Sequence, residues 1–548
     1  MQKKKLSIFI VTSIFLIILL RIPSLLEPIW NIDEAVEATV GTVVLDGGVP
    51  YKDAISHRSP IIYYLYAAVF LISGPNNTLA VHVALILLVV AVNILIFSIC
   101  NKIVGYRCAV FGSIFFVIIS SFYQIPAAMF ALNTEWVVIF FEVIGMLLLL
   151  KGLEQGNSFV FLFWAGCSFC FAMFSKQSAL LDFFGASAFL TVYAALTSHN
   201  EGTSIPRRIV KITIPFLSGF GVITAFFVIF FLAQHAFREF WFYVYTYNTK
   251  YYLAGFPLSK RMSNLIDSFF SITMPFNFGL FVFLGILAVF YNTRSCKTSD
   301  QCKKSYLQWL FVCLAATSLL GSLIGGRDWG HYYIPIIPSW CILIGIGIDS
   351  FLNLIESILK DIDTAKVRVL KSSGVILLVF FLLVPSLKSI RIVFQSLQNN
   401  EWATGELTFQ KPIKYLKENV VENERIFVWG FYPQMYVLTN KKPASRFVFC
   451  NFLTGLSIGV NDNQSGKTEK WAVPGAFELL LNDLEKSRAK FIIDTSPSGY
   501  MKYELYPIQK YKLLSDYIEK NYVLDQNYHS QDNLPESNVK VYRRNQGR

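Results

Sequence analysis

The sequence predicts a polytopic α-helical membrane protein with a soluble α/β domain at its C-terminal end. Apolar runs recur along the first 390 residues, and the mean hydropathy of the chain is +0.48. Only 15% of the 548 residues are charged, against about 25% in ordinary soluble domains. After about residue 390 the composition becomes polar. We therefore expect a transmembrane domain over 1–390 and an α/β domain over 391–548.

Eleven apolar runs are predicted to cross the membrane as helices. The first follows three lysines, as in a signal peptide, but no small-residue cleavage site follows it, so we interpret it as a retained helix. The eleven runs are 6–22, 79–100, 107–124, 136–151, 158–175, 177–197, 209–233, 263–291, 305–325, 333–350 and 368–389.

A further apolar stretch, 60–74, is predicted to lie at the membrane surface. It has about 15 apolar residues where a span needs about 20, and it begins with Pro60. If it does not cross, loops on the side of the N-terminus hold 17 basic residues and the opposite loops hold eight. Because short cytoplasmic loops are enriched in Lys and Arg, we expect a cell-membrane protein with a cytoplasmic N-terminus and an extracytoplasmic C-terminal domain.

Two features that suggest other functions are explained by the membrane. The net charge of +12 would suggest nucleic-acid binding in a soluble protein, but most basic residues lie in short loops between apolar runs, so we exclude nucleic acid. Cys167 and Cys170 form a C-x-x-C inside an apolar run with no second Cys or His cluster nearby. We interpret them as small packing residues rather than a metal site.

The C-terminal region alternates between helical and extended patterns. Helices are predicted at 409–420, 432–440 and 475–489, and strands at 425–430, 444–450 and 490–494. This alternation favours a doubly wound sheet.

Acidic residues gather just after the first apolar run. Asp33, Glu34 and Glu37 open a predicted helix over 33–46, which Gly47-Gly48 closes. Acids at a helix N-terminus complement the helix dipole, so capping alone could explain them. A carboxylate at the water edge of a bilayer is also a candidate general base.

Basic groups are predicted on the same outer face, and they are Arg58, Lys176, Arg327 and His331. Lys176 could equally be a snorkelling lysine, and His331 a satisfied loop histidine. Carboxylates with fixed cations suit a reaction in which a carboxylate takes a proton from an acceptor hydroxyl. The cations would hold an anionic leaving group such as a phosphate.

Several motifs in order resemble the GT-C membrane glycosyltransferases, in the bacterial branch of protein O-mannosyltransferases and aminoarabinose transferases. The resemblance covers most of 1–390, and WGFYPQMY is similar to a C-terminal module of many bacterial members. The membrane motifs are the Asp33-Glu34 pair, TVVLDGGVPYKD, HRSPIIYYLYA, ALNTEW, FSKQSALL and GHYYIPIIP.

This resemblance implies transfer of a sugar from a polyprenyl-phosphate donor to an acceptor, with inversion at the sugar. It makes Asp33 the general base or a metal-contacting acid, with Glu34 the neighbouring candidate. Many members have Asp where this chain has Asn133, so Glu135 is the stand-in second acid. Some members bind a divalent ion between such acids and others do not, so metal use stays open. Tyr63 joins the four basic residues as a predicted substrate-binding residue.

Other interpretations and the identity of the substrates stay open. The aromatic segment 237–262 suits a substrate wall or an interface belt equally. A transporter or flippase of a lipid-linked saccharide is the main alternative function, and a non-catalytic membrane anchor for the α/β domain is another. The resemblance names neither the sugar nor the acceptor, which could be a protein, a glycolipid or a cell-wall polymer of the cell envelope.

Overall fold

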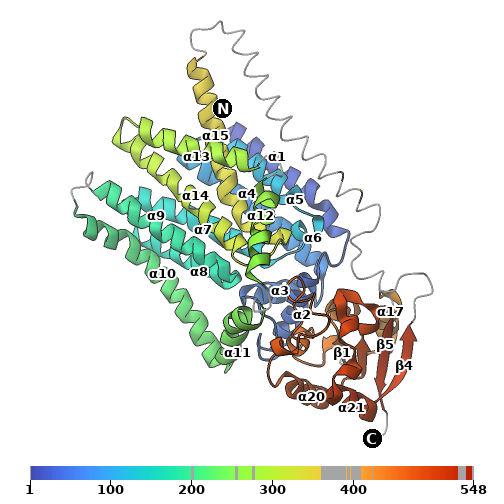
Figure 1. Cartoon of the computed structure of the whole chain (residues 1–548). Helices are drawn as coiled ribbons and strands as arrows, with labels where there is room; N and C mark the ends of the chain where they lie inside the picture. Colours follow the sequence, from blue (N-terminus) through green and yellow to red (C-terminus); the bar gives the residue numbers. More distant parts are fainter. Residues whose placement is uncertain are drawn as a thin grey trace. The chain divides into compact units, whose positions relative to one another are not determined.

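A computed structural model describes residues 2–198, 203–252, 257–273, 278–358, 391, 395, 409–421, 424–528 and 538–545. The chain divides into two compact units (Figure 1). The first unit comprises Met1–Ser24, Leu85–Phe227 and Arg261–Asn400, and the second comprises Leu25–Ala84, Val228–Lys260 and Glu401–Arg548. The predicted span 368–389 lies outside the described residues.

The first unit is built mainly from helices. Within the described residues, eight helical segments are long and apolar enough to cross a membrane, and α5 and α8 are apolar but have only 17 residues each. The main helices are α1 (Gln2–Arg21), α4 (Thr78–Ile103), α5 (Tyr106–Phe122), α7 (Thr134–Glu154), α8 (Phe159–Ser175), α9 (Leu180–Ser198), α10 (Ile205–Ala233), α12 (Leu258–Thr273), α13 (Phe278–Ser295), α14 (Ser299–Leu323) and α15 (Ile337–Ile358). Of these, α4, α10 and α12 begin or end in the second unit.

Small and polar residues hold these helices together. A Cβ added to Gly166 of α8 would lie 1.9 Å from the carbonyl oxygen of Phe216, so only glycine allows α8 and α10 to approach this closely. Asn93 of α4 donates to Ser13 Oγ of α1 at 3.1 Å and accepts from Ser113 Oγ of α5 at 2.8 Å. In an apolar surrounding, such bonds satisfy polar groups that water cannot reach.

One predicted span is wrong, and the helix predicted to lie at the membrane surface is short, as expected. Within the described residues the run 263–291 comprises two helices, α12 and α13. The stretch 60–74 forms α3 (Ile61–Ser73), whose 13 residues fall short of the about 20 that a span needs.

The C-terminal part of the second unit contains a five-stranded sheet in the order β2-β1-β3-β5-β4. Strand β1 is parallel to β2 and β3, whereas β5 is antiparallel to β3 and β4. The strands are β1 (Arg425–Trp429), β2 (Lys442–Pro443), β3 (Phe491–Asp494), β4 (Tyr522–Tyr528) and β5 (Val539–Arg544). The main helices around them are α17 (Gln410–Asn419), α18 (Gln434–Thr439), α20 (Ala476–Ser487) and α21 (Lys512–Asn521).

The sheet corrects two predictions. It is mixed rather than doubly wound, because β4 and β5 add antiparallel partners at one edge. Residues 444–450 form no strand. They are mostly buried in an irregular path, and an apolar run does not distinguish such a path from a strand.

The second unit also contains the loop that follows the first predicted span. Its helix α2 (Ile32–Leu45) packs against α3 and against α18 of the α/β region. Lys442 Nζ lies 2.7 Å from Asp46 Oδ2, Asn76 donates to Asn440 Oδ1, and the Ile55 N–H donates to the Arg446 carbonyl oxygen. The α/β region is therefore attached to the acidic loop by side-chain and backbone contacts.

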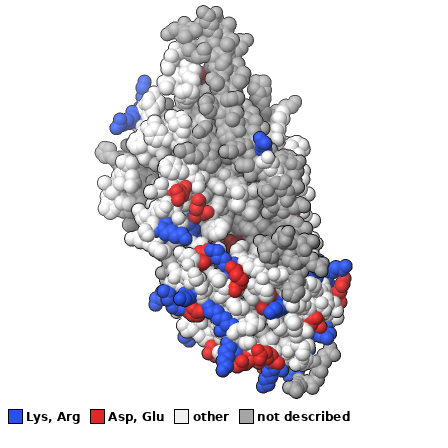
Figure 2. All heavy atoms as spheres, turned by 45° about the vertical axis from the view of Figure 1, so that its right-hand side comes forward, with Lys and Arg blue, Asp and Glu red and all other residues white. Residues whose placement is uncertain are grey.

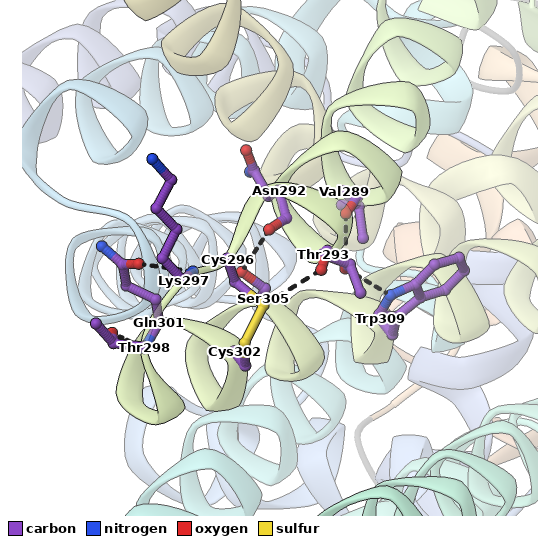
Figure 3. The surroundings of a disulfide bond; sticks show 10 residues. All are labelled: Val289, Asn292, Thr293, Cys296, Lys297, Thr298, Gln301, Cys302, Ser305 and Trp309. Carbon is purple, nitrogen blue, oxygen red and sulfur yellow. Dashed lines mark hydrogen bonds between the residues drawn. A yellow bond between two sulfur atoms is a disulfide. The ribbon is translucent and has the colours of Figure 1, made fainter.

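A disulfide between Cys296 and Cys302 closes the turn between α13 and α14 (Figure 3). Nearby, Ser305 donates to the Asn292 carbonyl oxygen and Trp309 Nε1 donates to Thr293 Oγ1. The sequence analysis did not identify this pair of cysteines. Disulfides are typical of oxidising compartments, whereas the basic residues of this turn are typical of a cytoplasmic loop, so the two features predict opposite sides of the membrane.

Thiol labelling of intact cells with an impermeant maleimide tests the orientation. From the distribution of basic residues we expect Asp46→Cys to react and Ser204→Cys to stay protected until the cells are permeabilised. In that orientation Cys296 and Cys302 should be reduced in intact cells and should form the disulfide on exposure to an oxidant. Labelling of Ser204→Cys but not Asp46→Cys from outside would overturn the orientation.

Candidate active site

The first candidate cluster lies at the N-terminus of α2 in the second unit. Asn31 caps the helix, since its side-chain oxygen accepts from the Glu34 N–H at 2.8 Å. The carboxylates of Asp33 and Glu34 in the first turn complement the helix dipole. Asn31 therefore performs the capping, and the carboxylates are held by other partners.

Glu34 is fully buried and both of its carboxylate oxygens are engaged. Oε2 accepts from the Trp30 N–H at 2.9 Å, and Oε1 lies 2.9 Å from His82 Nε2. His82 is also fully buried, in the first turns of α4. The sequence analysis missed His82, although an ionisable side chain inside an apolar run is a signal that could have identified it. This pair ties the start of α2 to α4.

Arg58 joins the other two carboxylates of the cluster. Its Nη2 lies 2.5 Å from Asp33 Oδ1 and its Nη1 lies 2.9 Å from Glu37 Oε1. The Asp33 side chain is 23% exposed, whereas Glu37 is 1% and Glu34 is 0% exposed. Burial alone would lower the pKa of Arg58, but the two carboxylates raise it well above its ordinary value. Of the three acids Asp33, Glu34 and Glu37, Asp33 is therefore the one that a substrate can reach.

The hydroxyls of two tyrosines, Tyr51 and Tyr63, donate to the carbonyl oxygen of Arg58. Tyr51 Oη donates to the Arg58 carbonyl oxygen at 2.7 Å. Tyr63, predicted to bind substrate, is fully buried, and its ring packs edge-on against that of Tyr51 with centroids 6.1 Å apart. Burial raises the pKa of the Tyr63 hydroxyl. Both side chains position the backbone of Arg58.

The second candidate cluster lies in the first unit, at the N-terminus of α7. Lys176 Nζ lies 2.6 Å from Glu135 Oε1 and 3.8 Å from the centre of the Tyr332 ring. His331 Nε2 lies 3.9 Å from the same Glu135 oxygen, and Thr134 donates to the other oxygen. The structure thus brings together three predicted residues, Glu135, Lys176 and His331. In the sequence His331 lies 155 positions after Lys176 and 196 positions after Glu135.

The fourth predicted cation, Arg327, lies in the same late loop as His331 and is 4% exposed. The sequence analysis missed another buried cation, Arg21 at the end of α1. Arg21 donates to the carbonyl oxygens of Ser120 and Met129 at 2.7 and 2.6 Å. It therefore ties the end of α1 to the backbone at Ser120 and Met129.

Two further buried carboxyl groups lie inside the helices of the first unit. Asp182 of α9 accepts from Thr317 Oγ1 at 2.6 Å and from Ser318 Oγ at 2.8 Å, and the second carboxyl group is that of Glu142 in α7. Both carboxyl groups are shielded from solvent. The sequence analysis did not use them, because each is a single acid in a long apolar run.

The two acids proposed as metal ligands each have a cationic partner. Asp33 faces Arg58, and Glu135 faces Lys176. A divalent cation at either carboxylate would have to displace a positively charged side chain. Within the described residues, no group of three or more His, Cys, Asp and Glu side chains could hold a metal ion. The donor sets do not fit a metal, so we derive no step through one.

Comparison with known proteins gives matches only at the level of structure. No protein-family model and no curated protein sequence matches the chain. ArnT from Cupriavidus metallidurans, bound to undecaprenyl phosphate, matches with a TM-score of 0.58 and 11% identity over 99% of this chain and 98% of that one.

A second solved structure is the oligosaccharyltransferase AglB from Archaeoglobus fulgidus, in complex with an inhibitory peptide and a dolichol-phosphate. It matches with a TM-score of 0.53 and 10% identity, over 94% of this chain and 72% of that one. Both are GT-C glycosyltransferases, and identities this low show a shared fold. The chain therefore has the fold of the GT-C membrane glycosyltransferases, with apolar helices and a C-terminal sheet as the sequence predicts.

Proposed function

We propose that this protein transfers a sugar from a polyprenyl-phosphate donor to an acceptor hydroxyl on the outer face of the membrane. The observation that carries the proposal is the ion pair between Asp33, the most exposed carboxylate of its cluster, and the guanidinium of Arg58. It places a proton acceptor beside a group suited to phosphate. The GT-C fold supports this, because ArnT and AglB have been solved with undecaprenyl phosphate and dolichol-phosphate.

In the proposed reaction Asp33 accepts the proton of the acceptor hydroxyl. The hydroxyl oxygen forms a bond to the anomeric carbon, the bond from that carbon to the phosphate oxygen breaks, and the polyprenyl phosphate leaves with the electron pair. Attack from the face opposite the phosphate inverts the sugar. Arg58 stabilises the negative charge that develops on the phosphate, because guanidinium forms charge-assisted bonds to phosphate oxygens.

The same ion pair supplies a way to activate the base. A carboxylate held by Arg58 is a weak base, since the guanidinium favours its ionised form. A donor phosphate would compete for Arg58, and Asp33 would become more basic as it loses that partner. Glu37, which is 1% exposed and lies 2.9 Å from Arg58 Nη1 through its Oε1, would keep Arg58 in place during the exchange.

The remaining predicted site residues receive supporting roles in this proposal. Lys176, Arg327 and His331 would bind anionic parts of the donor, with Glu135 orienting Lys176. Glu34 would be a positioning residue, because its buried oxygens are occupied by Trp30 and His82. The extracytoplasmic α/β domain would contribute to the acceptor side.

One observation favours transport of a lipid-linked saccharide as a second candidate function. The buried Glu142 and Asp182 lie within apolar helices, and intramembrane carboxyl groups are common on transport pathways. A transporter would still move its lipid after Asp33 is neutralised, whereas a transferase would lose its product.

Replacement of Asp33 by Asn should abolish sugar transfer, because the amide cannot accept the proton. We expect a loss of about 10²- to 10⁴-fold, the usual contribution of a general base. Mass spectrometry of envelope glycans and lipids should show a glycosyl addition in cells with the wild-type protein. That addition should be missing both in cells with Asp33→Asn and in cells without the protein.

Asp46→Asn is the matched control, because Asp46 ends the same helix and its side chain is 39% exposed. It should give the wild-type product. Wild-type product levels from Asp33→Asn, at equal amounts of protein in the membrane, would remove Asp33 from the mechanism.

Glu34→Gln should distinguish the role of Glu34 from that of the adjacent Asp33. An amide oxygen can still accept the Trp30 N–H, so we expect this variant to keep most of its activity. Loss of the charged partner of His82 should lower the free energy of unfolding by about 1–3 kcal/mol. Thermal unfolding and product formation are measured on the same preparations, and a stable but inactive Glu34→Gln protein would make Glu34 the base.

Arg58→Gln and Lys176→Gln should weaken use of the donor more than use of the acceptor. We expect the KM for the donor to rise about tenfold or more, since each change removes a charge-assisted hydrogen bond to phosphate. Lys52→Gln, at another basic residue of the Arg58 loop, serves as the control. An equal rise in the KM values of donor and acceptor would contradict the assignment of these cations to the phosphate.

A further inference from the structure

A basic pocket lies at one end of the C-terminal sheet, within the second unit. It has a volume of about 380 Å³, and it lies where β1 and β3 begin and β5 ends. Backbone bonds join these strands there, as the Lys490 N–H donates to the Arg425 carbonyl oxygen and the Arg544 N–H to that of Lys490. The lining consists of Glu424, Arg425, Ser487, Arg488, Lys490, Arg543, Arg544 and Asn545.

The charge of this lining is mostly positive. Five of the eight residues are basic and one is acidic. Lys490 is paired with Glu424 at 2.8 Å, and Arg543 lies 3.2 Å from Asp525 outside the lining. Within the described part of the chain, Arg425, Arg488 and Arg544 have no carboxylate at ion-pair distance. On the face drawn in Figure 2, by contrast, many basic and acidic side chains lie beside one another.

Two buried hydrogen-bond donors of the lining have no partner among the described residues. They are the hydroxyl of Ser487 and Nη1 of Arg544. A buried donor without a partner costs free energy, so such groups are rare unless a ligand or water completes them. Both donors are therefore available to water or to an acceptor-rich ligand in this pocket.

The helix that ends here explains only part of the charge. Arg488 follows the last residue of α20, and a cation there complements the helix dipole. Its backbone lies in the left-handed region at φ +47°, a position where glycine is usual. Arg425 and Arg544 belong to strands, so the helix dipole gives no reason for them.

We propose that this pocket binds the phosphate group of a ligand distinct from the donor bound by Arg58. A phosphate presents several acceptor oxygens, which match the Ser487 hydroxyl and the arginine donors that remain after Arg425 Nη1 has donated to the Pro443 carbonyl oxygen. The volume admits a phosphate together with an attached glycerol or sugar unit. The proposal does not depend on the proposed transfer reaction.

Calorimetric titration of the detergent-purified full chain with inorganic phosphate tests the site. All proteins carry Arg58→Gln, so that the candidate active site contributes equally to each titration. The test variant adds Arg425→Gln and Arg488→Gln, two exposed residues whose replacement leaves the core intact. The control adds Lys486→Gln, an exposed cation of α20 that does not line the pocket.

We expect the test variant to bind phosphate at least tenfold more weakly than the control. A difference of less than twofold, or no measurable binding by the control, would overturn the proposal.

Titration in nanodiscs then separates two sources of the phosphate. If the control binds inorganic phosphate more weakly in phosphatidylglycerol discs than in phosphatidylcholine discs, the lipid headgroup competes for the site. The test variant should then show no such difference, and the phosphate belongs to a lipid headgroup. Equal affinities in the two discs would identify a soluble phosphate-bearing molecule. Either result agrees with a phosphate site.

Discussion

The candidate site depends on one arginine that is held between two carboxylates. Arg58 bridges Asp33 and Glu37, and the buried Glu37 would bear a costly charge without a paired cation. Removal of either acid would leave Arg58 partly uncompensated. Removal of Arg58 would leave two like charges one helical turn apart. The geometry of α2, of the loop before α3 and of the exposed Asp33 follows from this arrangement.

The rest of the second unit keeps this bridge in place. The Glu34–His82 pair fixes the start of α2 from the buried side, and α18 packs against the same helix. Tyr51 and the Ile55 backbone position the loop that carries Arg58. A site built on a loop thus gains the rigidity of a helix terminus and of a folded α/β region. This rigidity matters because a base and a phosphate-binding group must keep their spacing within tenths of an ångström.

Hydropathy and motif order were sufficient to predict most of the helices and the GT-C fold, because bilayer thickness sets the length of an apolar run. The same signal failed at 263–291, where the described residues form two helices, and at 444–450, where burial without regular pairing resembles a strand. The order of motifs also selected Glu135, Lys176 and His331, which the structure brings together. Whether they act in a reaction stays a prediction.

Other features depend on partners that the sequence does not reveal. In the sequence His82 is one histidine in an apolar run, and only the fold brings Glu34 beside it. The burial of Tyr63 is likewise set by the fold. The basic pocket combines residues from three strands and a helix end, up to 121 positions apart in the chain. Spacing along the sequence carries no signal for such a set.

The central claim is that a lipid phosphate binds Arg58 and displaces Asp33 from its ion pair with the guanidinium. A structure determined with polyprenyl phosphate bound tests it most directly. The account predicts phosphate oxygens about 2.7–2.9 Å from the Arg58 guanidinium, with Asp33 turned toward the acceptor space and no longer paired with Arg58. A bound polyprenyl phosphate that lies elsewhere, with the Asp33–Arg58 pair unchanged, would contradict it.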